Sequence, residues 1–124
     1  MVKRSEIQSM SIDRLVQRFV EIGEKQDHSL LMDRFAEFNR LYKEKATVVE
    51  ELKAREGNQR RALLRLYDHP NMQVRLNAVK ATLAVAPQQA RLALKSIADS
   101  HHYPQAGEAG MSIINLDRGI FKPT

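Results

Sequence analysis

Four histidines are the residues of this sequence best suited to bind a metal ion: His28, His69, His101 and His102. Helical metal sites usually place histidines and carboxylates three or four positions apart, as in the HExxH motif. No HExxH occurs here, and the most suggestive group is the adjacent pair His101-His102 with Asp99 nearby. Adjacent histidines in a turn usually face solvent, so we expect no metal site.

Nucleophilic catalysis needs a hydroxyl or thiol beside a base, and a third group that orients the base. The chain has no cysteine, and none of its seven serines lies in a Gly-x-Ser-x-Gly turn. The glycines at 107 and 110 belong to neither the GxxxxGK[ST] nor the GxGxxG pattern of phosphate-binding loops. We therefore expect a protein that is not an enzyme, with no catalytic residues and no cofactor.

Lysine and arginine cluster in the middle of the chain and are the strongest candidates for contacting a partner. Residues 53–95 contain nine basic residues and two acidic ones, and the whole chain has a net charge of +5. Arg61 and Arg65 lie four positions apart, which would place them on one face of an α-helix. Such a surface attracts phosphate groups or an acidic protein. The candidate partner-binding residues are Arg60, Arg61, Arg65, Lys80, Arg91 and Lys95. In the alternative interpretation these charges only keep the protein soluble.

The length of 124 residues is enough for one domain with a hydrophobic core. No apolar run reaches the length of about 18 residues that spans a membrane, and the N-terminus lacks the apolar segment of a secretory signal. The absence of cysteine suits a reducing compartment. We expect a cytoplasmic protein with a flexible extension over residues 1–10, where Met10 is an alternative start, and a single domain over residues 11–124.

Apolar residues recur every three or four positions along the chain, which predicts an all-α fold. Ser11 is a suitable N-cap for a first helix that ends near Gly23, and a second helix is expected to start after Asp27. The second helix is predicted to be long, over about residues 29–55. We expect its aromatic stripe in the core: Phe35, Phe38 and Tyr42.

Shorter helices are expected after Gly57, with Pro70 and Pro104 in turns between them and Pro87 at the first position of a helix. The apolar C-terminal segment is expected to dock Phe121 on the core. The predicted helices cover residues 59–67, 72–85, 87–99 and 106–116.

The segment LLRLYDHPNMQVRLNA, residues 63–78, resembles a HEAT repeat. In that repeat an apolar helix end precedes Asp and Pro in a turn, and Val-Arg with small residues opens a second helix. The resemblance assigns structural roles to Asp68, Pro70, Val74 and Arg75, and implies that Arg75 pairs with Asp68. A further helix pair would stack on the first. The implied fold is a HEAT-like or armadillo-like α-α superhelix of about six helices.

A wider resemblance covers residues 11–124. The phrases LVQRFVEI, NRLYKEK, ELKAREGNQRRALLRLYDHPNMQVRLNAVKATLAVAP and YPQAGEAGMS are similar to a bacterial family catalogued only as a domain of unknown function. This resemblance implies an α-α superhelix and no particular activity.

The function that we expect is that of a non-catalytic protein-interaction or scaffold module, by analogy with HEAT-like proteins. One alternative is a nucleic-acid-binding protein that uses the basic face. Another is a toxin-neutralising (immunity-type) binding protein. We expect no membrane partner, and a monomer or a weak homodimer formed through the long helix.

Overall fold

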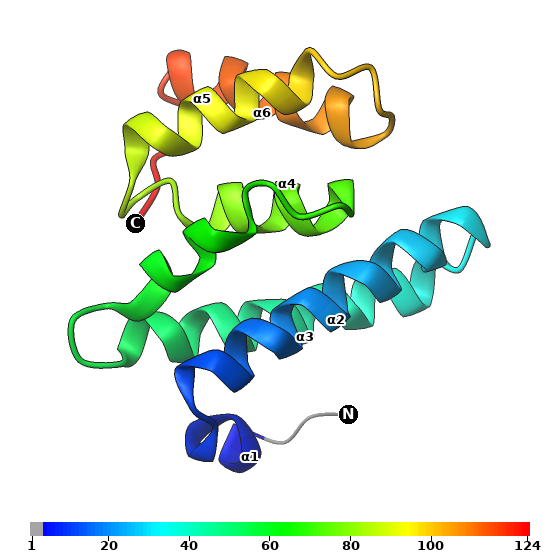
Figure 1. Cartoon of the computed structure of the whole chain (residues 1–124). Helices are drawn as coiled ribbons and strands as arrows, with labels where there is room; N and C mark the ends of the chain where they lie inside the picture. The colour runs from blue at the N-terminus through cyan, green and yellow to red at the C-terminus, as the bar shows by residue number, and fades with distance from the viewer. Residues whose placement is uncertain (1–3) are drawn as a thin grey trace. The chain divides into compact units, whose positions relative to one another are not determined.

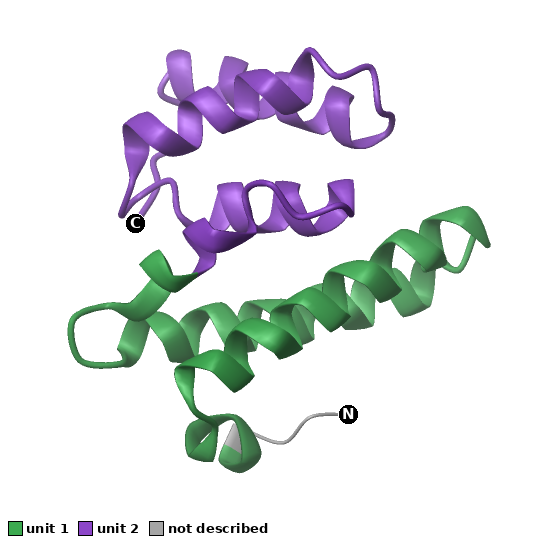
Figure 2. Ribbon diagram, in the orientation of Figure 1, with its two compact units in different colours: residues 1–62 green, residues 63–124 purple. Residues whose placement is uncertain are grey.

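The structure is a computed structural model that describes residues 4–124. Within this range the chain forms six α-helices and one 3-10 helix, with no β-strand, which confirms the predicted all-α class. The helices fall into two compact units, divided between Ala62 and Leu63 (Figure 2). The helices of each unit pack mainly on one another. The prediction of a single domain over residues 11–124 stays a prediction.

Unit 1 is built on a pair of antiparallel helices (Figure 1), α2 (Ile12–Leu31) and α3 (Phe35–Ala54). The predicted cap of α2 is confirmed, because the Ser11 hydroxyl accepts a hydrogen bond from the Arg14 backbone N–H at 3.1 Å. Each helix has 20 residues and is therefore about 30 Å long.

The expected helix end at Gly23 is wrong, since α2 continues to Leu31. Gly23 is buried, and the buried side of the helix continues past it to the polar residues Gln26 and Ser29. The chain turns only after Met32, where Asp33 has a left-handed conformation with φ of 54°. Packing along α3 outweighs the cost of about 1 kcal/mol that one glycine imposes on a helix.

The aromatic stripe of α3 is not the core that we predicted. Phe35 is 61% exposed and Tyr42 is 55% exposed, while Phe38 is only partly buried. The buried line of α3 consists instead of Leu41, Val48 and Leu52. At about 100° per residue, Tyr42 points about 100° away from Leu41. The helix carries two apolar stripes, and the one without aromatic residues faces α2 and α1.

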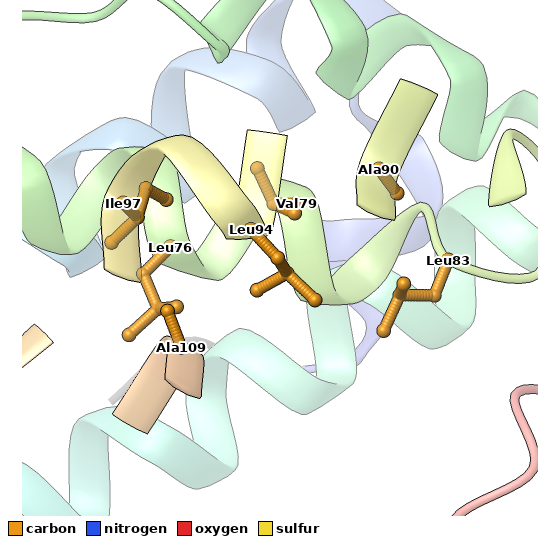
Figure 3. Packing of buried hydrophobic residues seen from close by; sticks show 7 residues of the cluster. All are labelled: Leu76, Val79, Leu83, Ala90, Leu94, Ile97 and Ala109. Carbon is orange, nitrogen blue, oxygen red and sulfur yellow. The ribbon is translucent and has the colours of Figure 1, made fainter. Parts of the chain in front are cut away.

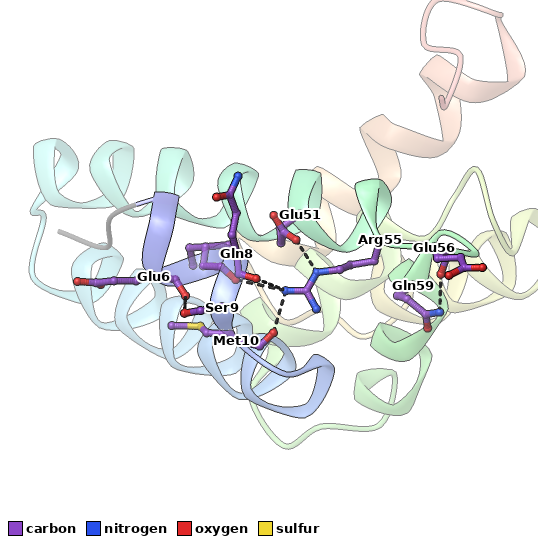
Figure 4. A network of polar contacts seen from close by, with 9 residues as sticks. Glu6, Gln8, Ser9, Met10, Glu51, Arg55, Glu56 and Gln59 are labelled. Atoms are coloured by element: carbon purple, nitrogen blue, oxygen red, sulfur yellow. Dashed lines mark hydrogen bonds and ion pairs between the residues drawn. The ribbon is translucent and has the colours of Figure 1, made fainter.

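A short helix, α1 (Arg4–Ser9), packs on α3 in unit 1. Ile7 is only 1% exposed. The Arg55 guanidinium donates from Nη2 to the backbone carbonyl of Met10 at 2.8 Å and to those of Ile7 and Gln8 at 3.3 Å (Figure 4). Its Nε donates to the Glu51 carboxylate. The flexible extension expected over residues 1–10 is therefore wrong for residues 4–10, and residues 1–3 lie outside the described residues.

The 3-10 helix η1 (Gln59–Leu66) follows a loop in which Gly57 has a φ of 77°. The predicted short helix is thus present, but with the tighter 3-10 geometry. Its side chains Leu63 and Leu66 are buried.

Unit 2 contains α4 (Met72–Ala81), α5 (Pro87–Ala98) and α6 (Gln105–Asp117), which pack on one another. The three helices enclose a small apolar core, drawn in Figure 3. Its buried members are Leu76, Val79, Leu83, Ala90, Leu94, Ile97 and Ala109. The sequence pattern had assigned apolar residues to more than one side of the α4 segment, and both Val74 and Leu76 are buried.

The ends of the unit 2 helices follow the predicted signals, with one exception. Pro87 occupies the first turn of α5, and Gly119, with φ of 69°, follows α6. The exception is α4, which we expected to reach Val85 and which ends at Ala81. Thr82 explains this end, because its hydroxyl donates to the Ala78 carbonyl at 2.8 Å and is hydrogen-bonded to the Tyr67 hydroxyl.

The C-terminal segment does not dock as expected, since Phe121 is 46% exposed and Ile120 is 68% exposed. The segment is held by its backbone, because the N–H groups of both residues donate to the Asn115 carbonyl. No helix among residues 4–124 combines the length and hydropathy needed to cross a membrane.

Candidate functional site

Three of the predicted partner-binding cations lie in unit 2 and are ion-paired there. Lys80 contacts Glu108 at 2.9 Å, and Lys95 contacts Asp99 at 2.9 Å. Arg91 makes a bidentate pair with Asp117, with nitrogen–oxygen distances of 2.7 and 3.1 Å. The excess of positive charge between residues 53 and 95 is therefore partly neutralised by acidic residues that follow residue 95 in the chain.

The other three predicted cations belong to η1. Arg60 is only 7% exposed and donates from Nε to the Asn58 side-chain oxygen at 3.0 Å, so it is not a surface contact residue. Arg61 and Arg65 are exposed, and both have interaction partners within the protein. In a 3-10 helix side chains eclipse every three residues, so positions four apart differ by about 120°. The expectation that Arg61 and Arg65 share one face is therefore wrong.

The turn predicted around Pro70 is present, but the ion pair predicted between Arg75 and Asp68 is not. Arg75 donates from Nε to the backbone carbonyl of His69, and no hydrogen bond or ion pair joins it to Asp68 in the part of the chain that the structure describes. Pro70 is exposed in the turn, and Val74 is fully buried at the start of α4. The Arg75 side chain thus holds the turn through the backbone carbonyl of His69, where we had expected it to bind the Asp68 carboxylate.

The titratable groups of the described residues make local contacts. Across residues 4–124 no group of three or more histidine, aspartate or glutamate side chains has the spacing of a metal site. His69 accepts a hydrogen bond at Nδ1 from the Asn71 backbone N–H at 3.0 Å, which is a turn contact. A hydrogen bond from the Ser29 hydroxyl to Glu37, 2.7 Å long, lowers the pKa of that carboxyl group, and Arg34 lowers it further.

The α5–α6 groove is a surface feature of unit 2 that combines predicted and unpredicted residues. It has a volume of about 490 Å³ and is lined by Gln88, Arg91, Leu92, Lys95 and Ile113. Leu92 is 73% exposed at its edge. The two cations of the groove are held in place by their ion pairs with Asp117 and Asp99. An apolar side chain flanked by ordered charges is the typical arrangement of a protein interface.

The outer face of α6 adds to the exposed apolar surface of unit 2. Met111 is 59% exposed and Ile114 is 44% exposed, three positions apart on one side of the helix. With Leu92 of the groove, these residues are three of the large apolar side chains that unit 2 exposes. No periodicity argument identified them, because an apolar residue on the outer side of a helix looks the same in the sequence as one on the inner side.

A second cavity, which we call the unit 1 cavity, lies among α1, α2 and α3 and has a volume of about 320 Å³. Its apolar wall is made of Ile7, Ile22 and Val48, each 1% exposed. Its polar side is formed by residues of α3, namely Arg40, Lys43, Glu44 and Thr47. We had not identified any of these residues as functional. α1 contributes only Ile7 to the lining, and the sequence contains no signal for the packing of α1 on α3 beyond this single apolar residue.

Comparison with known proteins places the chain in a family. Residues 13–117 match the family described as Domain of unknown function (DUF2019). The protein therefore belongs to the DUF2019 family. This confirms the predicted membership of a domain-of-unknown-function family. A solved structure similar to this chain is that of the protein RPA1889 from Rhodopseudomonas palustris CGA009, which is 49% identical, with a TM-score of 0.93 over 95% of this chain and 98% of that one. No curated protein is similar to this DUF2019 chain.

Proposed function

We propose that this DUF2019 protein is a non-catalytic protein-interaction module that binds its partner at the α5–α6 groove. The observation that carries the proposal is the exposure of Leu92, at 73%, next to two cations already ordered by ion pairs. Burying such a leucine contributes about 1.5–3 kcal/mol to an association. Cations held by Asp117 and Asp99 lose little side-chain entropy on binding, which lowers the cost of the interface.

The proposal includes a HEAT-like arrangement, in which helix pairs stack and the last pair leaves one face for a partner. The helix pair α5 and α6, the HEAT-type turn at Pro70 and the buried Val74 support it. It also includes a cytoplasmic location, which the cysteine-free sequence suits. Neutralising a toxin domain is one form that such protein binding takes.

Nucleic-acid binding through the basic residues has less support. Lys80, Arg91 and Lys95 each have a carboxylate within 2.9 Å, so a phosphate would have to displace Glu108, Asp117 or Asp99. Each displacement removes part of the electrostatic gain on which phosphate binding depends. A protein partner can use these pairs as they stand.

Affinity purification from the native host tests the proposal with two matched variants. Leu92→Glu places a charge in the α5–α6 groove, and Leu31→Glu places one on unit 1 at a leucine that is equally exposed, at 76% against 73%. We expect Leu92→Glu to lose the partner, and the affinity between the purified protein and its purified partner to fall about 10- to 100-fold. Leu31→Glu should retain the partner. If all baits recover the same partners with equal affinity, the groove is not the binding surface.

A further inference from the structure

The outer face of α3 carries an apolar stripe that unit 1 does not use for its own packing. Phe35 and Tyr42 are each more than half exposed. The stripe continues along the helix to Ala46, which is exposed, and Val49, which is partly buried. These four residues follow one another at steps of seven, four and three, which is the spacing of a helix face that packs against another helix. The described part of the chain leaves the middle of this face open.

Two side chains of opposite charge flank the stripe on the same side. Lys43 and Glu50 are seven positions apart, both are exposed, and each directly follows an apolar residue of the stripe. About 10 Å separates them along the helix axis, so they do not pair with each other. Among residues 4–124 neither side chain makes a hydrogen bond or an ion pair, whereas the next carboxylate, Glu51, is paired with Arg55.

The positions of these two charges make the outer face of α3 complementary to itself. The midpoint between Lys43 and Glu50 lies next to Ala46. When two copies of α3 meet antiparallel about a two-fold axis at this midpoint, Lys43 of each copy faces Glu50 of the other. Ala46 then lies at the crossing point, where a small side chain lets two helices approach closely. A partner that carries only one sign of charge would match one of the two charged residues and repel the other.

We propose that two copies of this protein associate through the outer faces of their α3 helices, with the helices antiparallel. In this dimer Tyr42 of each copy packs beside Val49 of the other, and two Lys43–Glu50 pairs form at the rim. The exposed parts of Phe35 and Tyr42 amount to about 100–150 Å² each, so the contact is smaller than the roughly 800 Å² per partner of a standard interface. We therefore expect a dissociation constant in the micromolar range. The proposal gives a surface and an orientation to the weak homodimer expected from the sequence.

Sedimentation equilibrium of the full chain, at micromolar to millimolar concentrations, tests the charge pairing. Lys43→Glu and Glu50→Lys each bring like charges together and should weaken the dimer about tenfold. The double variant Lys43→Glu/Glu50→Lys restores both pairs with their signs exchanged, so it should dimerise like the wild type. Lys25→Glu makes the same charge change at an exposed position of α2 and should leave the dimer unchanged.

Cysteine cross-linking tests the antiparallel orientation, because the chain has no cysteine of its own. Ala46→Cys places one thiol of each copy beside the two-fold axis and should form an intermolecular disulfide under mild oxidation. Asn39 is also exposed on α3. In the antiparallel pair it lies about 20 Å along the axis from its counterpart, beyond the limit of about 7 Å between the Cα atoms of a disulfide. Asn39→Cys should therefore not cross-link.

Three results would each overturn the proposal. The first is a wild-type protein that stays monomeric at millimolar concentration. The second is a dimer that Lys43→Glu does not weaken, or that the double variant does not restore. The third is cross-linking through Asn39→Cys, which would indicate parallel helices. The outer face of α3 shares no residue with the α5–α6 groove, so none of these results bears on the proposed protein interface of unit 2.

Discussion

Replacing Arg55 by alanine should detach α1 from unit 1. The side chain donates to three carbonyl acceptors in the last turn of that helix and just after it, at 2.8 Å to Met10 and 3.3 Å to Ile7 and Gln8. The 2.8 Å bond is charge-assisted and contributes about 1.5–3 kcal/mol, and the two longer bonds from the same nitrogen add less. Exposing Ile7, which is 1% exposed in the native protein, costs about 1.5–3 kcal/mol more. We expect a total loss of about 3–6 kcal/mol in the stability of α1 on α3.

Native-state hydrogen exchange measures this stability directly, because the amides of α1 report its local opening. In Arg55→Ala the exchange of α1 amides should speed up at least tenfold while the amides of α5 keep their rates. Glu51→Ala removes the ion pair of Arg55 on α3 but leaves its carbonyl contacts, so it should have a smaller effect. Arg14→Ala, which breaks an exposed pair with Glu21, should change little. Unchanged α1 exchange in Arg55→Ala would refute the reasoning.

Two further predictions concern acid stability and nucleic acid. The Ser29 hydroxyl lowers the pKa of Glu37 below its usual value of 4.5, so this carboxylate stabilises the folded state above pH 4.5 and the gain is lost as the pH falls through its lowered pKa. Ser29→Ala should therefore raise the pKa of Glu37 in an NMR titration, and its stability deficit should shrink below pH 4.5; a deficit independent of pH would contradict this. In gel-shift titrations at low and high salt we expect no binding of duplex or single-stranded nucleic acid. A complex that weakens steeply with salt would show that phosphates displace the acid partners of Lys80, Arg91 and Lys95.

Local signals predicted much of the helical structure. The cap at Ser11, the first-turn position of Pro87 and the turns at Pro70 and Pro104 were all found where the residue types indicated them. These signals work because each depends on the backbone geometry of one residue and its nearest neighbours. They failed at Gly23, where the conformational cost of a glycine is small beside the packing of a long helix pair.

The candidate site was predicted less well than the helices. Arg91 and Lys95 do line a groove, but the two residues that give it an apolar character, Leu92 and Ile113, were not singled out. Arg60 has the charge expected of a partner-binding residue, but it is buried and cannot contact a partner at the surface. Charge counting along a segment cannot detect acids such as Glu108 and Asp117, which the fold brings back to the basic residues from up to 28 positions away.

By itself, the sequence determined the all-α class and the approximate helix boundaries after Gly57, because helical periodicity and turn residues act over a few positions. Only the tertiary structure decided which of two apolar stripes of α3 became core, which basic residues of unit 2 form ion pairs, and that α1 packs on α3 with Ile7 buried. Each of these outcomes depends on which helix packs against which. That choice is made by side chains far apart in the chain, and no local pattern records it.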